Sequence, residues 1–213
     1  MSTKIMLVRH GFSVANEKNI YAGIKDCPLS ELGLKQAELC GKFFEKSNIS
    51  AIYSSPLKRA YDTALSISKV TGLDIVVERN LRECEGGDWE GEKYEDLCRH
   101  YPVEYGIWVN DIGNAKCPNG ESVKDFADRI FSAITGIAKK HDGECICIVT
   151  HATPIRVIEA IAKNVPIYNL KDIDWCANAS INVFIYEPEN FSIVETNNDR
   201  YLGDLKTHLP ENV

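Results

Sequence analysis

The stretch Ile5-Met6-Leu7-Val8-Arg9-His10-Gly11 places an arginine, a histidine and a glycine directly after four apolar residues. A short, continuous apolar run predicts a buried strand, and glycine lets the chain turn sharply and approach a ligand closely. Arg9 and His10 therefore stand at a strand end, and that edge is where open α/β sheets bind ligands. His151 follows another apolar run, Cys145–Thr150. We expect the two histidines and Arg9 to form an anion site that contains a nucleophile.

Outside these two runs, strand-like and helix-like segments alternate along the chain, which predicts an α/β fold with a largely parallel sheet. The pattern predicts strands at 51–54, 75–77 and 181–186. Residues 193–195 are expected to pair antiparallel to 181–186 at one sheet edge. Helices are predicted at 30–46, 55–71, 121–140 and 154–162. Residues 11–29 are expected to form a loop. Residues 84–120 are expected to be irregular, with a short helix near 92–101. An excursion of that length in a compact domain usually serves function, so we predict a lid-like insertion.

The length, charge and amino-acid composition of the chain limit the classes of function that fit it. The chain has 213 residues, 44% hydrophobic and 26% charged, with a net charge of −7, which is typical of one globular domain. We therefore expect residues 1–213 to form a single domain. The acidic balance argues against nucleic acid, whereas a few converging cations still permit a small phosphorylated ligand. No secretory or membrane segment is recognisable, so a cytoplasmic protein is predicted.

Eight cysteines are present without any Cys-x-x-Cys pair. In a cytoplasmic chain we expect reduced thiols that pack as small hydrophobes. Cys145 and Cys147 share one strand face, but further ligands are missing nearby. Neither a metal site nor a cofactor is predicted.

Arg59 is the next candidate, because it lies in the first turns of the helix that follows the strand at 51–54. A helix start attracts anions through its free N–H groups and its dipole, and arginine adds planar donors suited to phosphate. Taken alone, Arg59 would be interpreted as a solvated surface cation. Its position beside the other strand ends favours the anion site.

A wider set of motifs occurs in a fixed order: Leu7–Gly11, Ser13, Asn16, Gly23–Asp26, Pro28, Leu29, Ser30–Gly33, Gln36, Ala37, Tyr53–Leu57, Arg59, Ala60, Thr63, Ala64, Leu81–Glu83, Gly87, Trp89–Gly91, Gly120–Ser122 and Val149–His151. With these motifs the chain resembles the histidine phosphatase superfamily, in the phosphatase branch of the phosphoglycerate mutase-like proteins. The resemblance implies a three-layer sandwich with a mostly parallel central sheet, helices on both faces and one antiparallel edge strand.

The resemblance also implies roles for individual residues. His10 would be the nucleophile that becomes a phosphohistidine, and Glu83 would protonate the departing alkoxide and later activate water. Arg9, Arg59 and His151 would hold the phosphoryl oxygens. The remaining substrate-binding positions would be Phe12, Ser13, Asn16, Gly23 and Ala152.

Two positions depart from the common pattern. Phe12 stands where many relatives have glutamate or glutamine, which alters the pocket mouth. Ala152 stands where many have glycine, but it still offers a backbone N–H. Neither change removes a reacting group.

These features predict a metal-independent phosphatase acting on a small phosphomonoester through a phosphohistidine. The alternative is a cofactor-dependent phosphoglycerate mutase; a non-catalytic phospho-ligand binding relative is a third interpretation. The 84–120 segment has few cations, namely Lys93, Arg99 and Lys116, which favours the phosphatase. Sugar phosphate, phosphoserine, α-ribazole phosphate and phosphoglycerate all stay open as substrates, and so does a homodimer.

Several nearby residues have plainer interpretations. Trp89 is expected to pack beneath a loop. Glu83 lies among Glu85, Asp88 and Glu90, where a lone glutamate would be a solvated charge. The remaining histidines, His100, His141 and His208, are expected to be exposed.

Overall fold

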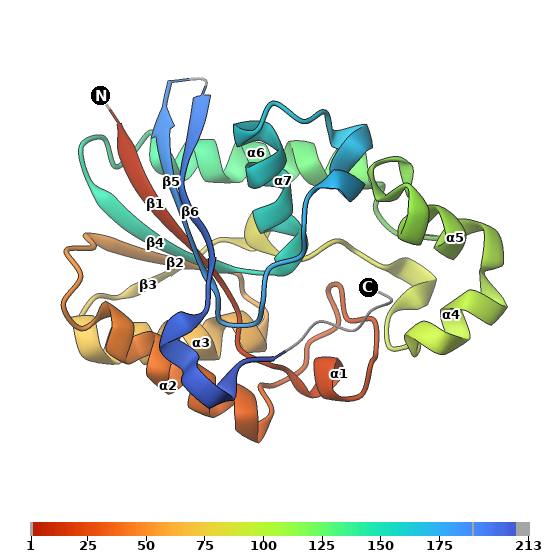
Figure 1. Cartoon of the computed structure of the whole chain (residues 1–213), viewed down its shortest axis with the longest axis horizontal. Helices are drawn as coiled ribbons and strands as arrows, with labels where there is room; N and C mark the ends of the chain where they lie inside the picture. The colour runs from red at the N-terminus through yellow and green to blue at the C-terminus, as the bar shows by residue number, and fades with distance from the viewer. Residues whose placement is uncertain (1, 189, 208–213) are drawn as a thin grey trace.

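The computed structural model describes residues 2–188 and 190–207. A six-stranded sheet runs through the molecule in the order β3-β2-β4-β1-β5-β6 (Figure 1). The strands are β1 (Thr3–Arg9), β2 (Ala51–Ser54), β3 (Ile75–Val77), β4 (Cys145–Thr150), β5 (Ile181–Glu187) and β6 (Asn190–Asn198). Strands β1 to β4 pair in parallel, and β5 runs antiparallel to both β1 and β6. The predicted mostly parallel sheet with an antiparallel edge pair is confirmed.

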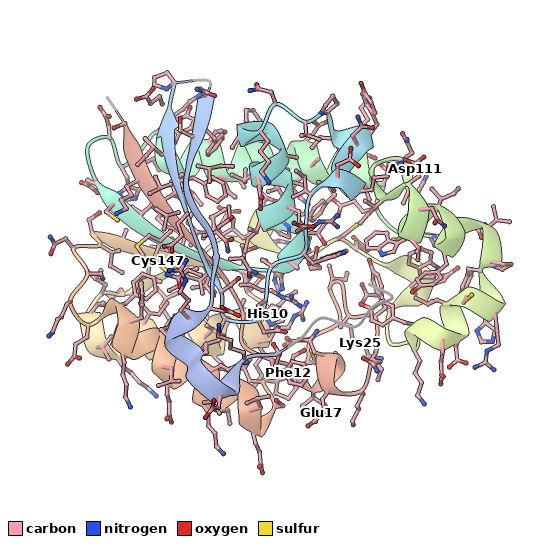
Figure 2. The ribbon with its side chains drawn as sticks, in the orientation of Figure 1. His10, Phe12, Glu17, Lys25, Asp111 and Cys147 are labelled. Carbon is pink, nitrogen blue, oxygen red and sulfur yellow. The ribbon has the colours of Figure 1, made fainter. Side chains whose placement is uncertain are left out.

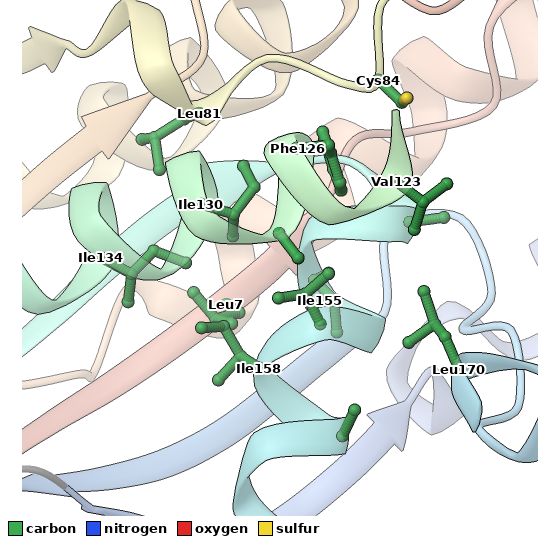
Figure 3. Close-up of a cluster of buried hydrophobic side chains, with 14 of the residues drawn as sticks. Leu7, Leu81, Cys84, Val123, Phe126, Ile130, Ile134, Ile155, Ile158 and Leu170 are labelled. Atoms are coloured by element: carbon green, nitrogen blue, oxygen red, sulfur yellow. The ribbon is translucent and has the colours of Figure 1, made fainter. Parts of the chain in front are cut away.

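Helices cover both faces of the sheet, as Figure 1 shows. Helices α2 (Glu31–Phe44) and α3 (Lys58–Thr71) cover one face, and α6 (Val123–Ala138) and α7 (Ala152–Ala162) cover the other. Helices α1 (Val14–Glu17), α4 (Tyr94–His100) and α5 (Pro102–Asn110) lie outside these layers. Alternate side chains of the central strands point into two separate hydrophobic cores, one on each face of the sheet. Ile5 and Leu7 pack toward α6 and α7 (Figure 3), whereas Met6 and Val8 pack with side chains of α2 and α3. This is the three-layer sandwich that the resemblance implied.

Local signals account for most helix ends. Ser30 and Ser122 cap α2 and α6 by accepting the backbone N–H three residues on. Gly72 ends α3 with φ of 74°, a left-handed conformation that suits glycine. Helix α3 begins at Lys58 rather than at Ser55, and Asp26 accepts its first N–H at 2.7 Å. Helix α7 begins at Ala152, two residues earlier than predicted.

Two helices lie where none was predicted. Helix α1 interrupts the expected loop at 11–29, because Ser13 and Asn16 form a capping box. Helix α5 follows α4 within the expected irregular segment. Pro102 begins α5, and the half-buried Gly106 lies inside it, so this glycine does not break the helix. That residues 1–213 form one domain stays a prediction.

The exposure of individual residues follows the sequence analysis with one correction. Trp89 is fully buried, and His100 is exposed. His141 was expected to be exposed, but it is half-buried, because its ring bridges the Tyr53 hydroxyl and the Glu144 carboxylate. His208 lies outside the described residues.

All eight cysteines are free thiols; Cys98 is exposed and most of the others are buried. No described helix is long and apolar enough to cross a membrane.

Candidate active site

A cavity of about 360 Å³ opens at the carboxyl ends of the parallel strands. Among the site residues that the sequence predicted, the cavity is lined by Arg9, His10, Phe12, Ser13, Asn16, Gly23, Arg59, Glu83 and Ala152. Figure 2 places His10 where β1 ends, with Phe12 on the segment that leads into α1 and Glu17 in the last position of that helix. The sheet edge therefore brings together residues that lie up to about 140 positions apart in the sequence.

His10 is held in one orientation by its own loop. Its Nδ1 lies 2.7 Å from the carbonyl oxygen of Gly11, and a carbonyl only accepts, so Nδ1 carries the proton. Burial, with Arg59 and Arg9 close by, holds the pKa of His10 well below its ordinary value. The imidazole is therefore neutral, with an unprotonated Nε2.

Two buried arginines supply positive charge. Arg9 is 5% exposed and Arg59 is 2% exposed, and neither forms an ion pair within the described part of the chain. Arg9 donates to the carbonyl of Cys176, and its buried Nε has no partner. Buried charges normally pair with an opposite charge. Two buried arginines without a carboxylate partner among the described residues fit a binding site for an anion.

Glu83 is fixed by two backbone donors. Its Oε1 accepts the N–H of Cys84 at 2.8 Å, and its Oε2 accepts the N–H of Thr153 at 3.2 Å. Thr153 lies in the first turn of α7, where free N–H groups and the helix dipole favour an anionic group. The carboxyl group therefore sits on the cavity wall beside the start of α7, which Ala152 opens.

Asn16 is oriented by its neighbours. Its Oδ1 accepts from the Ser13 backbone, the Ser13 hydroxyl and Nδ2 of Asn178, at 3.1, 2.9 and 3.2 Å respectively. Three donors on Oδ1 assign the amide orientation and leave its Nδ2 donors for a ligand. The Ser13 hydroxyl already donates to Oδ1 of Asn16, so Ser13 orients the Asn16 amide.

His151 differs from the expectation that it lines the pocket. It is fully buried, and its ring centroid lies 5.1 Å from that of His10. Its Nε2 lies 2.8 Å from the Ser55 hydroxyl, and its Nδ1 has no hydrogen-bond partner in the part of the chain that the structure describes. Burial, with Arg59 and His10 nearby, holds its pKa well below the ordinary value. A neutral imidazole therefore lies directly beside His10.

Close backbone packing frames the cavity. An added Cβ at Gly23 would lie 1.9 Å from the carbonyl oxygen of Cys84, so only glycine fits there. Glu90 binds the same loop, because its carboxylate accepts the N–H groups of Ile24 and Lys25. Glu90 is thus structural rather than a free solvated charge. No group of three or more His, Cys, Asp or Glu side chains suited to a metal ion occurs among the described residues.

The comparison with protein families decides the assignment: the family model for the histidine phosphatase superfamily (branch 1) matches residues 5–199. The chain belongs to this superfamily. This histidine phosphatase is 31% identical over 202 residues to phosphoserine phosphatase 1 of Hydrogenobacter thermophilus, covering 95% of each chain. It is 35% identical to the metal-independent phosphoserine phosphatase of Arabidopsis thaliana, covering 81% of this chain and 79% of the relative. Bacillus stearothermophilus YhfR has a similar structure, with a TM-score of 0.89, 26% identity and coverage of 94% of this chain and 99% of that one.

The superfamily and these relatives show the enzyme class: the protein is a phosphoric monoester hydrolase, as predicted. The structure adds residues to the histidine phosphatase site that the sequence analysis missed. Ser55 binds His151, and Thr63 accepts the N–H of Gly11 at 3.1 Å. The cavity is also lined by Glu17, Tyr94, Trp108, Trp175 and Asn178.

One signal could have located part of this set. Because β5 is antiparallel, its beginning lies at the same sheet edge as the ends of the parallel strands. Assigning the antiparallel orientation to 181–186 would have directed the preceding residues, which include Trp175 and Asn178, to the site.

Proposed function

We propose that this histidine phosphatase hydrolyses a small phosphomonoester through a phosphohistidine on His10. The observation that carries the proposal is the contact between His10 Nδ1 and the Gly11 carbonyl. It leaves a neutral nitrogen, Nε2, available in a cavity with two buried, unpaired arginines. A neutral imidazole nitrogen is a competent nucleophile, and the arginines complement the charge on a phosphoryl group.

In the first step, Nε2 of His10 attacks phosphorus in line and the P–O bond to the alcohol breaks. Glu83 gives its proton to the departing alkoxide. Arg9, Arg59 and His151 hold the phosphoryl oxygens, and Asn16 adds a neutral donor. In the second step water attacks phosphorus and the P–N bond breaks. Glu83 takes the proton from that water, and orthophosphate leaves.

The cavity supports a substrate whose leaving group carries an ammonium. Among the described residues, Arg9 and Arg59 are the lysine or arginine side chains that line it, and the exposed carboxylate of Glu17 lines it too. Tyr94 and Trp108 also line the cavity, and aromatic faces attract cations, whereas the Arg156 guanidinium already lies over the Trp175 ring at 4.0 Å. Phosphoserine combines a phosphate with an ammonium. The names of the two phosphoserine phosphatase relatives support the same choice.

Helices α4 and α5 are proposed to act as the lid. Tyr94 of α4 and Trp108 of α5 line the cavity, and their rings pack with Tyr21. Lys93 pairs with Glu95 at 3.6 Å and Arg99 with Asp96 at 2.9 Å. The third lysine or arginine at 84–120, Lys116, is not among the described residues that line the cavity. A lid without free cations in the cavity gives no counter-charge for a bound bisphosphorylated intermediate. We therefore favour the phosphatase over the phosphoglycerate mutase.

Rapid quench with phosphate-labelled phosphoserine tests the proposal. The wild type should form an acid-labile, base-stable phosphoenzyme and then release orthophosphate, and His10→Ala should form none. An undiminished rate in His10→Ala would remove the nucleophile from the mechanism. Fast isomerisation of 3-phosphoglycerate with little orthophosphate, activated by 2,3-bisphosphoglycerate, would establish the mutase instead.

The substrate class is tested separately with three phosphomonoesters of equal length: phosphoethanolamine, 2-hydroxyethyl phosphate and phosphoglycolate. Their leaving groups are cationic, neutral and anionic. The wild type should prefer the cationic substrate over the neutral one by about tenfold in kcat/KM, the scale of one partly exposed charge contact with aromatic support. Glu17→Gln should abolish that preference without slowing the neutral substrate. An equal rate for all three in the wild type would reject the ammonium subsite while leaving the phosphohistidine step intact.

A further inference from the structure

Ser55 and His151 form a polar pair with no exposed surface. Ser55 follows β2 and His151 follows β4, and these strands are parallel neighbours. The backbone N–H of Ser55 donates to Val149 at 3.0 Å, which extends the strand pairing to the start of the α3 connection. The hydroxyl of Ser55 therefore meets the imidazole of His151 at a fixed place on the sheet edge, 2.8 Å from its Nε2.

The surroundings of Ser55 give this hydrogen bond its direction. A serine hydroxyl has one proton to donate and two lone pairs. Its Oγ accepts the backbone N–H of Leu57 in a long contact of 3.4 Å. Across residues 2–188 and 190–207, Nε2 of His151 is the acceptor that the structure places within reach of the hydroxyl proton. Since a buried donor left without an acceptor costs about 1–3 kcal/mol, the hydroxyl should donate to Nε2.

We infer that Ser55 is a positioning residue that donates its hydroxyl proton to Nε2 of His151 and thereby keeps the imidazole proton on Nδ1. This inference rests on the proposed function for the role of that proton. Nδ1 is buried without a protein partner, in a ring beside His10. An N–H at Nδ1 provides a donor for a phosphoryl oxygen, whereas a bare nitrogen there would repel it. A phosphate group would satisfy this unpartnered atom.

The two histidines then present different ring nitrogens to the phosphoryl group. Both carry the proton on Nδ1, but His10 uses that N–H to bind the Gly11 carbonyl and presents a bare Nε2. His151 gives its Nε2 to Ser55 and presents Nδ1–H. One ring therefore offers the phosphoryl group a nucleophile and the other offers it a hydrogen-bond donor, although both are neutral and both carry their proton on the same ring nitrogen.

Nitrogen NMR of the full chain with ¹⁵N-labelled histidine tests this directly, because long-range ¹H–¹⁵N spectra distinguish the two neutral tautomers. His151→Gln and His10→Gln assign the two spin systems. The wild type should show both rings protonated on Nδ1. In Ser55→Ala the His151 signals should move toward the Nε2-protonated pattern or a mixture, while the His10 signals stay. Finding His151 protonated on Nε2 in the wild type would overturn the inference.

Kinetics provide the second readout. Ser55→Ala should lower kcat by about 10- to 100-fold with a smaller change in KM, because the donor is needed most when charge develops. Ser55→Thr keeps the hydroxyl and should recover much of the loss. Ser54→Ala is the matched control, because Ser54 is equally buried and its hydroxyl binds only the Ser55 carbonyl among the described residues. Equal losses in Ser54→Ala and Ser55→Ala would reduce Ser55 to a packing role.

The two hypotheses fail differently. The NMR result needs no substrate, so it stands even if His10 forms no phosphoenzyme. Conversely, a phosphoenzyme on His10 with His151 protonated on Nε2 would retain the proposed function and reject the role of Ser55.

Discussion

The Nη2 atom of Arg59 lies 2.8 Å from the carbonyl oxygen of Gly23, 36 residues earlier in the chain. The same guanidinium also donates to the carbonyls of Ala22 and Lys25. Arg59 therefore binds the loop that forms one side of the cavity while its charge stays unpaired. A single planar side chain serves both the shape of the site and its positive potential.

Arg59→Lys separates these two contributions. Lysine keeps the charge but lacks the planar fork, so we expect kcat/KM to fall by about 10²- to 10³-fold. Loss of the carbonyl contacts should lower the free energy of unfolding by about 1–3 kcal/mol. Steady-state kinetics and urea unfolding measure the two effects. Lys58→Ala, one residue earlier and exposed in an ion pair with Asp62, should change neither, and wild-type activity in Arg59→Lys would contradict the prediction.

Glu83→Gln tests the proton donor. Glutamine keeps the shape and the acceptor for one backbone N–H, but it cannot transfer a proton. Phosphorylation by an alkyl phosphate should slow by about 10²- to 10⁴-fold, because its alkoxide must be protonated as it leaves. An activated aryl phosphate should lose much less in that step. Pre-steady-state phosphorylation rates are required, because dephosphorylation also uses Glu83.

The exposed neighbour Glu85→Gln is the control for this comparison and should retain both rates. Equal losses for the alkyl and aryl substrates in Glu83→Gln would mean that Glu83 only supports the cavity. The donor would then have to be sought elsewhere, with His151 the next candidate.

The stability of the free enzyme should decrease below about pH 6.5. Burial depresses the pKa of both His10 and His151 in the folded state, whereas the unfolded chain binds their protons near pH 6.5. The unfolded state therefore gains more protons as the pH falls, and the free energy of unfolding drops by up to about 1.4 kcal/mol per pH unit for each histidine. Urea unfolding between pH 7.5 and 5 measures this slope.

His10→Gln and His151→Gln should each flatten the slope, whatever they do to stability at pH 7.5. His100→Gln removes an exposed imidazole and should leave the slope unchanged. If neither buried-site variant differs from the wild type, these histidines do not govern the pH dependence.

Activity should persist after exhaustive chelation. Arg9, Arg59 and His151 supply the donors and positive charge that divalent cations provide to phosphoryl groups in other enzymes. Orthophosphate release from phosphoserine in excess EDTA measures this. Loss of activity in the chelator, with recovery on adding one specific metal ion, would overturn the prediction.

The sequence predicted many of the residues that line the cavity because they lie in local patterns. Arg9 and His10 follow an apolar run, and parallel strands bring such ends to one edge. Ser55 could not be predicted as a partner of His151, because their contact depends on β4 lying beside β2. Helix α5 was missed because Gly106 normally signals a break. Glycine inside a helix costs about 1 kcal/mol relative to alanine, and the burial of Tyr105 and Trp108 offsets that cost.

Strand order also has a consequence for the synthesis of the protein. β4 lies between β1 and β2, yet it is made more than 90 residues after β2. A nascent chain that has emerged only as far as α6 can pair β2 with β3 but cannot join β1 to them. When β4 (Cys145–Thr150) inserts between β1 and β2, the sheet becomes continuous from β3 to β1. The same insertion places His151 beside His10. Joining β1 to β2 through β4 and placing His151 beside His10 are therefore one step, and β5 and β6 are still to be made at that point.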